Sequence, residues 1–247
     1  MFQIKNNRVK FFFKHLLISF LVLMLVMIVV FFIWYPAPLA DAVGVTTIFV
    51  MMLVVDVIVG PLLGLIVYKE GKKSLKLDLS IIIVLQIMAF CYGVFSIYQG
   101  RPVWLVYSVD RFELIRKNEI VEENIEDALP QFQNISWFSP KYAAIRLSTD
   151  SKQKSADIFS EVFDGISIAQ KPARYMDYNQ VKDQVIEKSN NINELKKYND
   201  IKSVQYILQK YPLANAFIPL QATAKDMTVL INSETGEVIK IVDLRPW

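Results

Sequence analysis

Cysteine and histidine are almost absent from this chain of 247 residues. The single cysteine is Cys91 and the single histidine is His15, which lies on the flank of the first hydrophobic run. Residues 99–247 therefore have no disulfide, no zinc site built from these ligands and no Ser-His or Cys-His nucleophile pair. A P-loop and a G-x-G-x-x-G motif are also missing. These absences argue against an enzyme, and the sequence predicts no catalytic residue, no cofactor and no metal site.

Charged residues are scarce before residue 99, where three long hydrophobic runs lie. A helix rises about 1.5 Å per residue, so roughly 20 apolar residues cross the ~30 Å hydrocarbon core of a bilayer. We therefore predict a membrane region over residues 1–98 with three transmembrane helices. The predicted spans are residues 16–35, 45–68 and 79–98.

The start of the chain has features of a secretory signal: a basic beginning, an apolar stretch and the small-residue sequence LADA at 39–42. The apolar stretch of such signals is about 7–15 residues long. Here the run is longer, and two more runs follow it. We therefore expect the first span to remain as a membrane anchor.

Lysine and arginine are absent from the first loop, PAPLADAVG, between the hydrophobic runs. Four basic residues precede the first span and four lie in the second loop, a distribution that follows the positive-inside rule. We expect the N-terminus and the second loop in the cytoplasm, and residues 99–247 outside, which is the periplasm in a Gram-negative bacterium. The basic residues concerned are Lys5, Arg8, Lys10 and Lys14, then Lys69, Lys72, Lys73 and Lys76.

The net charge of +3 comes from this membrane region. Residues 1–98 hold eight Lys/Arg against four Asp/Glu, whereas residues 99–247 hold 19 against 20. The basic balance therefore serves membrane topology, and it gives no reason to expect a nucleic-acid partner.

Residues 99–247 have the pattern of an exported α+β domain. Runs rich in β-branched and aromatic residues predict strands, and apolar residues at helical spacing predict helices. Asp200 is placed to cap the last helix, and NSETG at 232–236 predicts a hairpin loop. Asp110 and Arg111 read as a turn or a structural ion pair. The predicted strands are 101–109, 141–148, 216–222, 226–231 and 237–244, and the helical faces are Ile158/Phe159/Val162/Phe163, Tyr178/Val181/Val185/Ile186 and Ile201/Val204/Ile207/Leu208.

A carboxylate in the middle of the second span is the most unusual feature of the membrane region. An ionised Asp at mid-bilayer costs about 2.5–3.5 kcal/mol on insertion scales, so it normally faces protein and has a partner. Asp56, Gly60 and Gly64 share one helix face because they are four residues apart. Gly60 and Gly64 form a G-x-x-x-G pattern that allows close helix approach, and Pro61 should kink the helix.

Three interpretations of this face remain open. Gln86, near the middle of the third span, could hydrogen-bond Asp56 inside a three-helix bundle. Alternatively, Asp56, Gly60 and Gly64, with Gln86, form a binding site for the transmembrane helix of a partner. A proton or ion pathway is the third interpretation. It is weakened because the three helices contain one carboxylate, and a proton relay needs several titratable groups.

Several segments together resemble the TfpX/TfpZ family of type IV pilin accessory proteins. They are FFIWYPAPLADAVGVTTIF (31–49), DVIVGPLLGLIVYKEGKKSLKLDL (56–79), YQGRPVWLVYSVDRFEL (98–114) and the terminal INSETGEVIKIVDLRPW. The resemblance implies a bacterial inner-membrane protein without catalytic activity that helps the major pilin to assemble into pili. A type IV pilin has one apolar membrane-spanning helix and a globular head outside, so both parts are expected contacts.

The resemblance therefore predicts a non-enzymatic accessory factor of pilus assembly or pilus dynamics. Its expected partners are the major type IV pilin, other inner-membrane components of the pilus machinery and the lipid bilayer. A membrane-bound sensory module with a periplasmic ligand-binding domain is the alternative, although the cytosolic segments are too short for an output domain. A pilin-modifying enzyme such as a glycosyltransferase would need a donor site, and the sequence shows none.

Overall fold

The computed structural model describes residues 7–247, and the chain divides into two compact units. One unit is the chain up to Ile33 together with Val45–Gln99, and we call it the helix bundle. The other is Trp34–Gly44 together with Gly100–Trp247, and we call it the C-terminal domain. Lys5, one of the basic residues before the first predicted span, lies outside the described residues.

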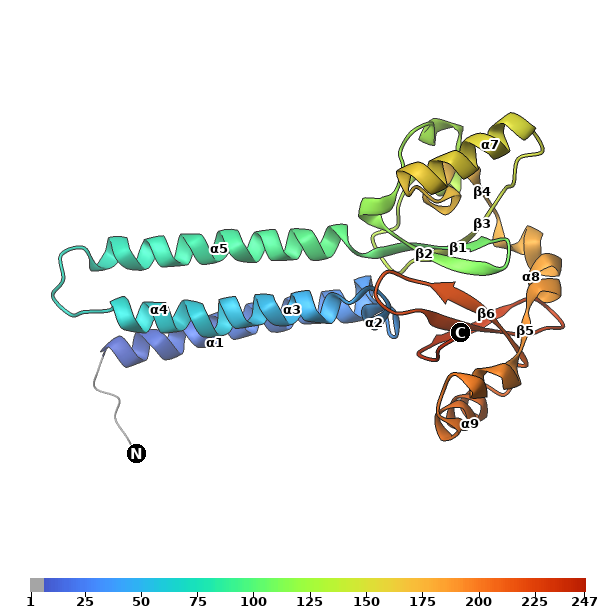
Figure 1. The fold of residues 1–247 in the computed structure, drawn as a ribbon. Coiled ribbons are helices and arrows are strands. Elements are labelled where there is room, and N and C mark those ends of the chain that lie inside the picture. The colour runs from blue at the N-terminus through green and yellow to red at the C-terminus, as the bar shows by residue number, and fades with distance from the viewer. Residues whose placement is uncertain (1–6) are drawn as a thin grey trace. The chain divides into compact units, whose positions relative to one another are not determined.

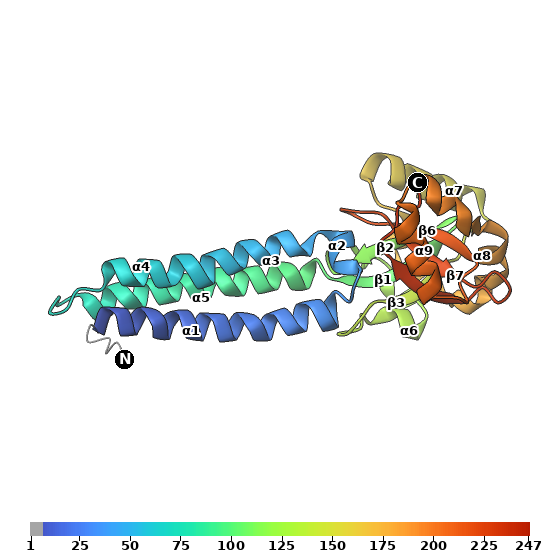
Figure 2. The same ribbon diagram turned by 90° about the horizontal axis from the view of Figure 1, so that it is seen from below.

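The helix bundle contains three helices that are long and apolar enough to cross a membrane, namely Asn7–Trp34, Val45–Val67 and Leu75–Gln99. They run side by side (Figure 2). The protein is therefore a multi-pass membrane protein, as the hydrophobic runs predicted. In detail, the first helix is α1 (Asn7–Ile28) and the π-helix η1 (Val29–Trp34), the second is α3 (Val45–Leu53), the π-helix η2 (Val54–Val59) and α4 (Gly60–Val67), and the third is α5 (Leu75–Gln99).

The C-terminal domain is built on a curled sheet with helices around it (Figure 1), which confirms the predicted α+β class. Among the described residues the sheet has eight strands in the order β4-β3-β1-β2-β6-β7-β8, and β5 pairs with β6. The β1–β3 and β2–β6 pairs are parallel and the others are antiparallel. The strands are β1 (Pro102–Ser108), β2 (Arg111–Arg116), β3 (Lys141–Ile145), β4 (Tyr175–Met176), β5 (Asn190–Asn191), β6 (Ala216–Gln221), β7 (Met227–Ile231) and β8 (Val238–Val242).

Three strands were not predicted from the sequence, β2, β4 and β5, and β2 pairs with β1 in a hairpin. Its turn places Val109 at φ 59°, and the next two residues, Asp110 and Arg111, form an ion pair at 2.8 Å. The Arg111 guanidinium holds the pKa of the Asp110 carboxyl below its usual value. The ion pair was expected. The hairpin escaped notice because a β-branched residue with positive φ is rare and is not a turn signal.

Two of the predicted helical faces pack against the domain, although Ile201 of the last one is 55% exposed. Tyr178, Val181 and Val185 are buried against the sheet along a 3-10 turn (Tyr178–Val181) and α8 (Lys182–Lys188). The last helix, α9 (Ile201–Lys210), begins at Asp200, whose carboxylate accepts a hydrogen bond from the Ser203 backbone N–H at 3.0 Å. The short helix α6 (Pro130–Gln133) was not predicted.

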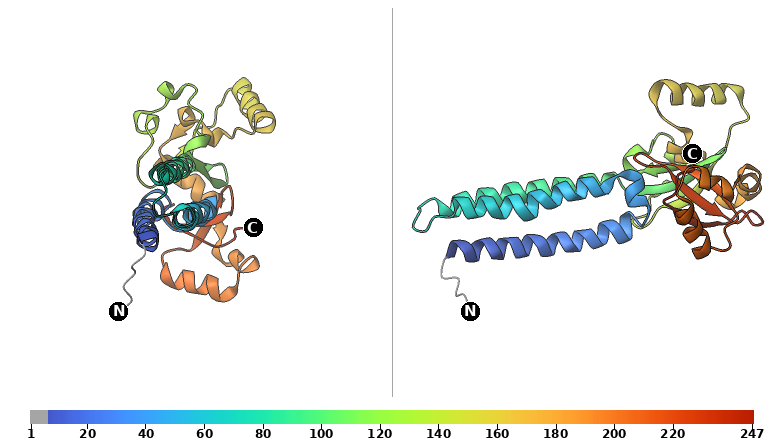
Figure 3. Two further views of the ribbon diagram at one scale, coloured as in Figure 1. Left: turned by 90° about the vertical axis from the view of Figure 1, so that its left-hand side faces the viewer. Right: turned by 60° about the horizontal axis from the view of Figure 1, so that its bottom comes forward.

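The third predicted face, on α7 (Ser151–Phe159) and the π-helix η5 (Ser160–Asp164), forms a helix but is not buried. Its four apolar residues are exposed, and two of them stack with ring centroids 4.2 Å apart. Figure 3 (right) shows α7 standing apart from the sheet between two loops. We call this exposed surface the α7 patch; it consists of Ile158, Phe159, Val162 and Phe163.

The first inter-span loop is a structural part of the C-terminal domain. It contains the short helix α2 (Leu39–Val43), and both Leu39 and Ala42 are buried in the main core of the domain. The Ala42 carbonyl accepts hydrogen bonds from the backbone N–H groups of Ala224 and Lys225 at 2.9 and 3.1 Å. The first span is therefore followed directly by a segment that the domain needs for its core.

Replacing Leu39 by alanine should destabilise the C-terminal domain by about 2–5 kcal/mol, because the change leaves a cavity in the core. Chemical unfolding of the full chain in detergent, followed by tyrosine and tryptophan fluorescence, measures the effect. The matched control is Leu213→Ala, since Leu213 is exposed in the same domain. Equal stability of the two variants would contradict the assignment of the loop to the core.

Candidate functional site in the helix bundle

The backbone around Asp56 departs from the regular α-helix. Val54–Val59 is a π-helix, in which the Gly60 N–H donates to the Val55 carbonyl rather than to that of Asp56. The next donor in this pattern would come from residue 61, which is proline and has no N–H. The Asp56 carbonyl is therefore left without a donor from its own helix in this pattern.

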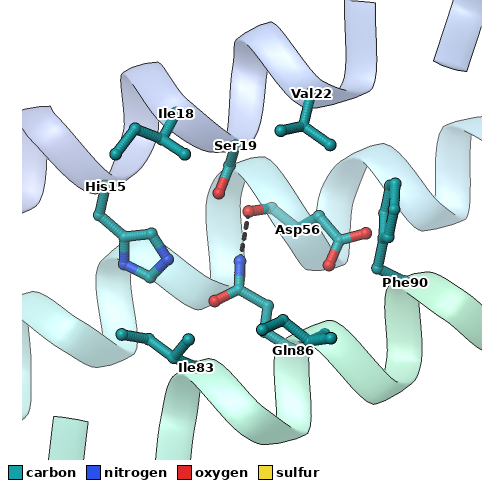
Figure 4. Close-up of a pocket in the computed structure, with 9 residues that line it drawn as sticks. His15, Ile18, Ser19, Val22, Asp56, Ile83, Gln86 and Phe90 are labelled. Atoms are coloured by element: carbon teal, nitrogen blue, oxygen red, sulfur yellow. Dashed lines mark hydrogen bonds between the residues drawn. The ribbon is translucent and has the colours of Figure 1, made fainter. Parts of the chain in front are cut away.

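A side chain from another helix supplies the missing donor. The amide nitrogen Nε2 of Gln86, on α5, donates to the Asp56 carbonyl oxygen at 2.7 Å (Figure 4). Neighbouring helices commonly satisfy backbone groups that proline frees inside membranes. Gln86 thus contacts Asp56, as one interpretation of the sequence suggested, but through the backbone carbonyl rather than through the carboxylate.

The hydrogen bond between Gln86 and the Asp56 carbonyl requires glycine at residue 60. A Cβ atom at residue 60 would collide with the side-chain amide of Gln86. Gly64, one turn further, faces a different helix, because its Cβ would lie 3.0 Å from a ring carbon of Phe11 on α1. The two glycines therefore allow α5 and α1, respectively, to approach the second helix closely, and both contacts lie within the bundle.

The Asp56 carboxylate has no comparable contact. The residue is only 5% exposed, and neither carboxylate oxygen has a hydrogen-bond partner among the described residues. In Figure 4 the carboxylate points toward the Phe90 ring, away from the Gln86 amide. A buried ionised group without a donor is costly in an apolar environment.

This carboxylate lines a cavity of about 320 Å³ that is partly open at the bundle surface. The first and third helices both pack on the second, and the cavity lies between them, so we call it the α1–α5 slot. Its walls are mostly apolar. The lining residues are His15, Ile18, Ser19 and Val22 from α1, Asp56 from the second helix, and Ile83, Gln86, Ile87 and Phe90 from α5.

Sequence reasoning missed the contribution of the first helix. His15 was placed only on the flank of the first hydrophobic run and Ser19 was not considered as a site residue, whereas both line the slot. The signal was present, because His15, Ser19 and Val22 are spaced by four and three residues and so share one helix face.

The slot offers a carboxylate that can accept hydrogen bonds. Among residues 7–247 no cluster of three or more His, Cys, Asp or Glu side chains could hold a metal ion. The slot brings together the Asp56 carboxylate, which lacks a partner within the described chain, and the Gln86 side chain, which lies beside the His15 imidazole. Such a site is suited to a group that donates hydrogen bonds.

A carboxylate in the C-terminal domain shows how unusual Asp56 is. Glu113, on β2, is also largely shielded from solvent, and burial raises the pKa of its carboxyl. However, the Ser167 hydroxyl donates to Glu113 at 2.7 Å, which opposes that shift in pKa. Glu113 is therefore satisfied within its own domain, whereas the Asp56 carboxylate is not.

Three spans, a slot lined by Asp56 and one α+β domain define a membrane-anchored protein. Comparison with known proteins identifies the family within this class. The model of the fimbrial assembly protein FimB family matches residues 4–44, which extend through the first span and α2. No solved structure matches the chain.

Three curated relatives from Dichelobacter nodosus are named fimbrial assembly proteins. The serogroup I and E1 proteins are 33% and 32% identical over 166 residues, which cover 66% of this chain and 64% of each relative. The protein of serogroups C1 and C2 is 37% identical over 119 residues, covering 47% of this chain and 88% of that relative. The chain belongs to this family of fimbrial assembly proteins, which confirms the resemblance to pilus accessory proteins.

Removing the Gln86 amide should destabilise the bundle by about 1 kcal/mol, the usual range for hydrogen bonds between membrane helices. The cost of Gln86→Leu should shrink in a Pro61→Ala background, because alanine at this position restores a backbone N–H that can reach the Asp56 carbonyl. A double-mutant cycle of unfolding in mixed detergent micelles measures this coupling. Equal cost in both backgrounds would contradict the assigned role of Pro61.

Replacing Asp56 by leucine should stabilise the helix bundle by about 1–3 kcal/mol when no partner protein is present. The change removes a buried carboxylate without a hydrogen-bond partner and keeps a similar side-chain volume. The same unfolding experiment measures the change. Gly60→Leu is the contrasting variant and should destabilise the bundle, because its side chain meets the Gln86 amide. A loss of stability in Asp56→Leu would mean that the carboxylate has a structural partner.

Proposed function

We propose that this protein is a non-enzymatic accessory factor for the assembly of type IV pili in the bacterial inner membrane. The names of its relatives support a role in fimbrial assembly. The aligned region covers just under two thirds of the first two relatives. A role in fimbrial assembly for this chain is therefore a proposal. The distribution of basic residues supports a cytoplasmic N-terminus and a periplasmic C-terminal domain.

The observation that carries the mechanism is the Asp56 carboxylate in the α1–α5 slot. Lipid acyl chains fill apolar gaps between helices, but they donate no hydrogen bond. A carboxylate facing them would remain unsatisfied, at a cost of a few kcal/mol. The occupant that suits the slot is therefore a transmembrane helix that carries a hydrogen-bond donor.

The partner of this mechanism is the major pilin, whose apolar helix spans the same membrane. A cavity of about 320 Å³ takes side chains that project from a neighbouring helix. The Asp56 carboxylate supplies the acceptor. Gly60 and Gly64 act indirectly in this proposal, since they let the three helices pack and so shape the slot.

The C-terminal domain contacts the pilin head in this mechanism. The α7 patch is the surface that favours such a contact, because two stacked phenylalanines and two aliphatic residues are exposed together on one helix. Contiguous apolar surfaces of this kind commonly mark protein interaction sites. Holding the pilin at both the helix and the head would keep it oriented for transfer into the fibre.

Photo-crosslinking in a pilus-producing bacterium tests the helix contact. A photoreactive residue at Ile83 or Ile87, which line the slot, should give a crosslinked product that contains the major pilin. The control positions are Met51 and Ile66, which are exposed on the second helix and do not line the slot. Products that contain only this protein would overturn the proposal and favour internal packing or self-association.

Asp56→Leu should reduce surface piliation strongly even though it stabilises the bundle. Counting of pili by electron microscopy, together with the amount of the variant in the membrane fraction, separates function from folding. Asp41→Leu is the matched control, since Asp41 is an exposed acidic residue on α2. Full piliation by the Asp56→Leu variant at normal protein level would show that the carboxylate is not used.

A further inference from the structure

Two consecutive aromatic residues of the C-terminal domain are strongly exposed in a loop. Trp137 is 65% exposed and Phe138 is 69% exposed. They lie between the end of α6 at Gln133 and the start of β3 at Lys141. A pair of large apolar rings on a loop tip is unfavourable in water, so the loop has the composition of a contact surface.

A buried arginine holds this loop in place. The Arg101 side-chain nitrogen Nη2 donates to the Ser136 carbonyl at 2.7 Å. The Arg101 guanidinium carbon also lies 5.8 Å from the centre of the Trp137 ring, within the range of a cation–π interaction. Because Arg101 is only 1% exposed, the loop is attached to a fixed point of the domain.

That fixed point lies next to the membrane in the sequence. The third span ends at Gln99, two residues before Arg101. The apolar part of this helix, residues 79–98, is about as long as the ~30 Å hydrocarbon core is thick, so Gln99 lies at the edge of that core. Two residues span at most about 7 Å, which is comparable to the thickness of the interfacial layer. Chain connectivity alone therefore keeps Arg101 near the lipid headgroups.

The end of the first span leads to the same place. Trp34 ends that helix, and the next residue, Tyr35, is buried in the C-terminal domain. The positive charges of Arg101 and Arg116 act on the Tyr35 hydroxyl, so Tyr35 lies within electrostatic range of both arginines. Both chain connections to the membrane thus enter the part of the domain that contains Arg101.

We propose that Trp137 and Phe138 insert into the headgroup region of the leaflet from which α5 emerges. Tryptophan is enriched at membrane interfaces, where its ring meets lipid and its N–H meets polar groups, and phenylalanine adds apolar contact. The loop is therefore a third attachment of the C-terminal domain to the membrane, in addition to the two chain connections. Its ligand is the phospholipid interface, and its effect is to restrict rotation of the domain above the bilayer.

Chain connectivity does not place the α7 patch near the membrane. It is also apolar and exposed, but its residues lie at least 57 positions along the chain from Arg101 and farther from the end of α5. It therefore provides an internal reference position for the experiment.

Lipid quenching of a fluorescent probe tests the proposal on the full chain. The protein is reconstituted into phosphatidylcholine/phosphatidylglycerol vesicles after Cys91→Ser, and the probe is attached at Ser139→Cys beside the intact aromatic pair. Lipids that carry a quencher near the headgroup should quench this probe several-fold more than a probe at Ser155→Cys on α7. Adding Trp137→Ser and Phe138→Ser should abolish the difference.

Two results would overturn the proposal. One is equal quenching at residues 139 and 155 combined with free access of aqueous iodide to the probe at 139. The other is strong lipid quenching at residue 139 that persists when both aromatic residues are serine, since another part of the domain would then make the contact. Trp137→Ser also removes the ring contact with Arg101, so the unfolding midpoint of each serine variant is measured alongside, and quenching is compared only below that midpoint.

Discussion

The hydrogen bond from the Gln86 amide to the Asp56 carbonyl organises the helix bundle. Pro61 removes the backbone donor, the π-helix shifts the Gly60 N–H to Val55, and Gly60 leaves room for the Gln86 side chain. In hydrocarbon a freed carbonyl must find a donor, so these residues act as one unit. Packing within the bundle therefore explains why residues 60, 61 and 86 are Gly60, Pro61 and Gln86. It does not explain why residue 56 carries a carboxylate.

The C-terminal domain depends on a different constraint, namely that its core includes Leu39 and Ala42 from the loop after the first span. The domain is thus completed by residues on both sides of the second and third spans. A family match over residues 4–44 fits this arrangement, because the first span belongs to one unit and the loop after it to the other. Assembly of the bundle and folding of the domain are therefore linked by the covalent chain.

The sequence predicted the three spans, the α+β class, the Asp200 cap and most strands, because hydrophobic length and period determine them. It identified Asp56 and Gln86 but not the atom through which they meet, since a π-helix cannot be seen in residue spacing. The exposure of the α7 patch could not be predicted either, because an apolar helix face has the same sequence pattern whether the domain core or a partner covers it.

The central claim is that the α1–α5 slot receives the pilin helix. Disulfide mapping tests it most directly, with a cysteine at Ile87 on the slot wall, Cys91 replaced by serine, and single cysteines placed along the apolar helix of the pilin. The account predicts disulfides at every third or fourth pilin position, as one helix face requires, and their loss in Asp56→Leu. Absence of disulfides along the helix, or an unchanged pattern in Asp56→Leu, would contradict it.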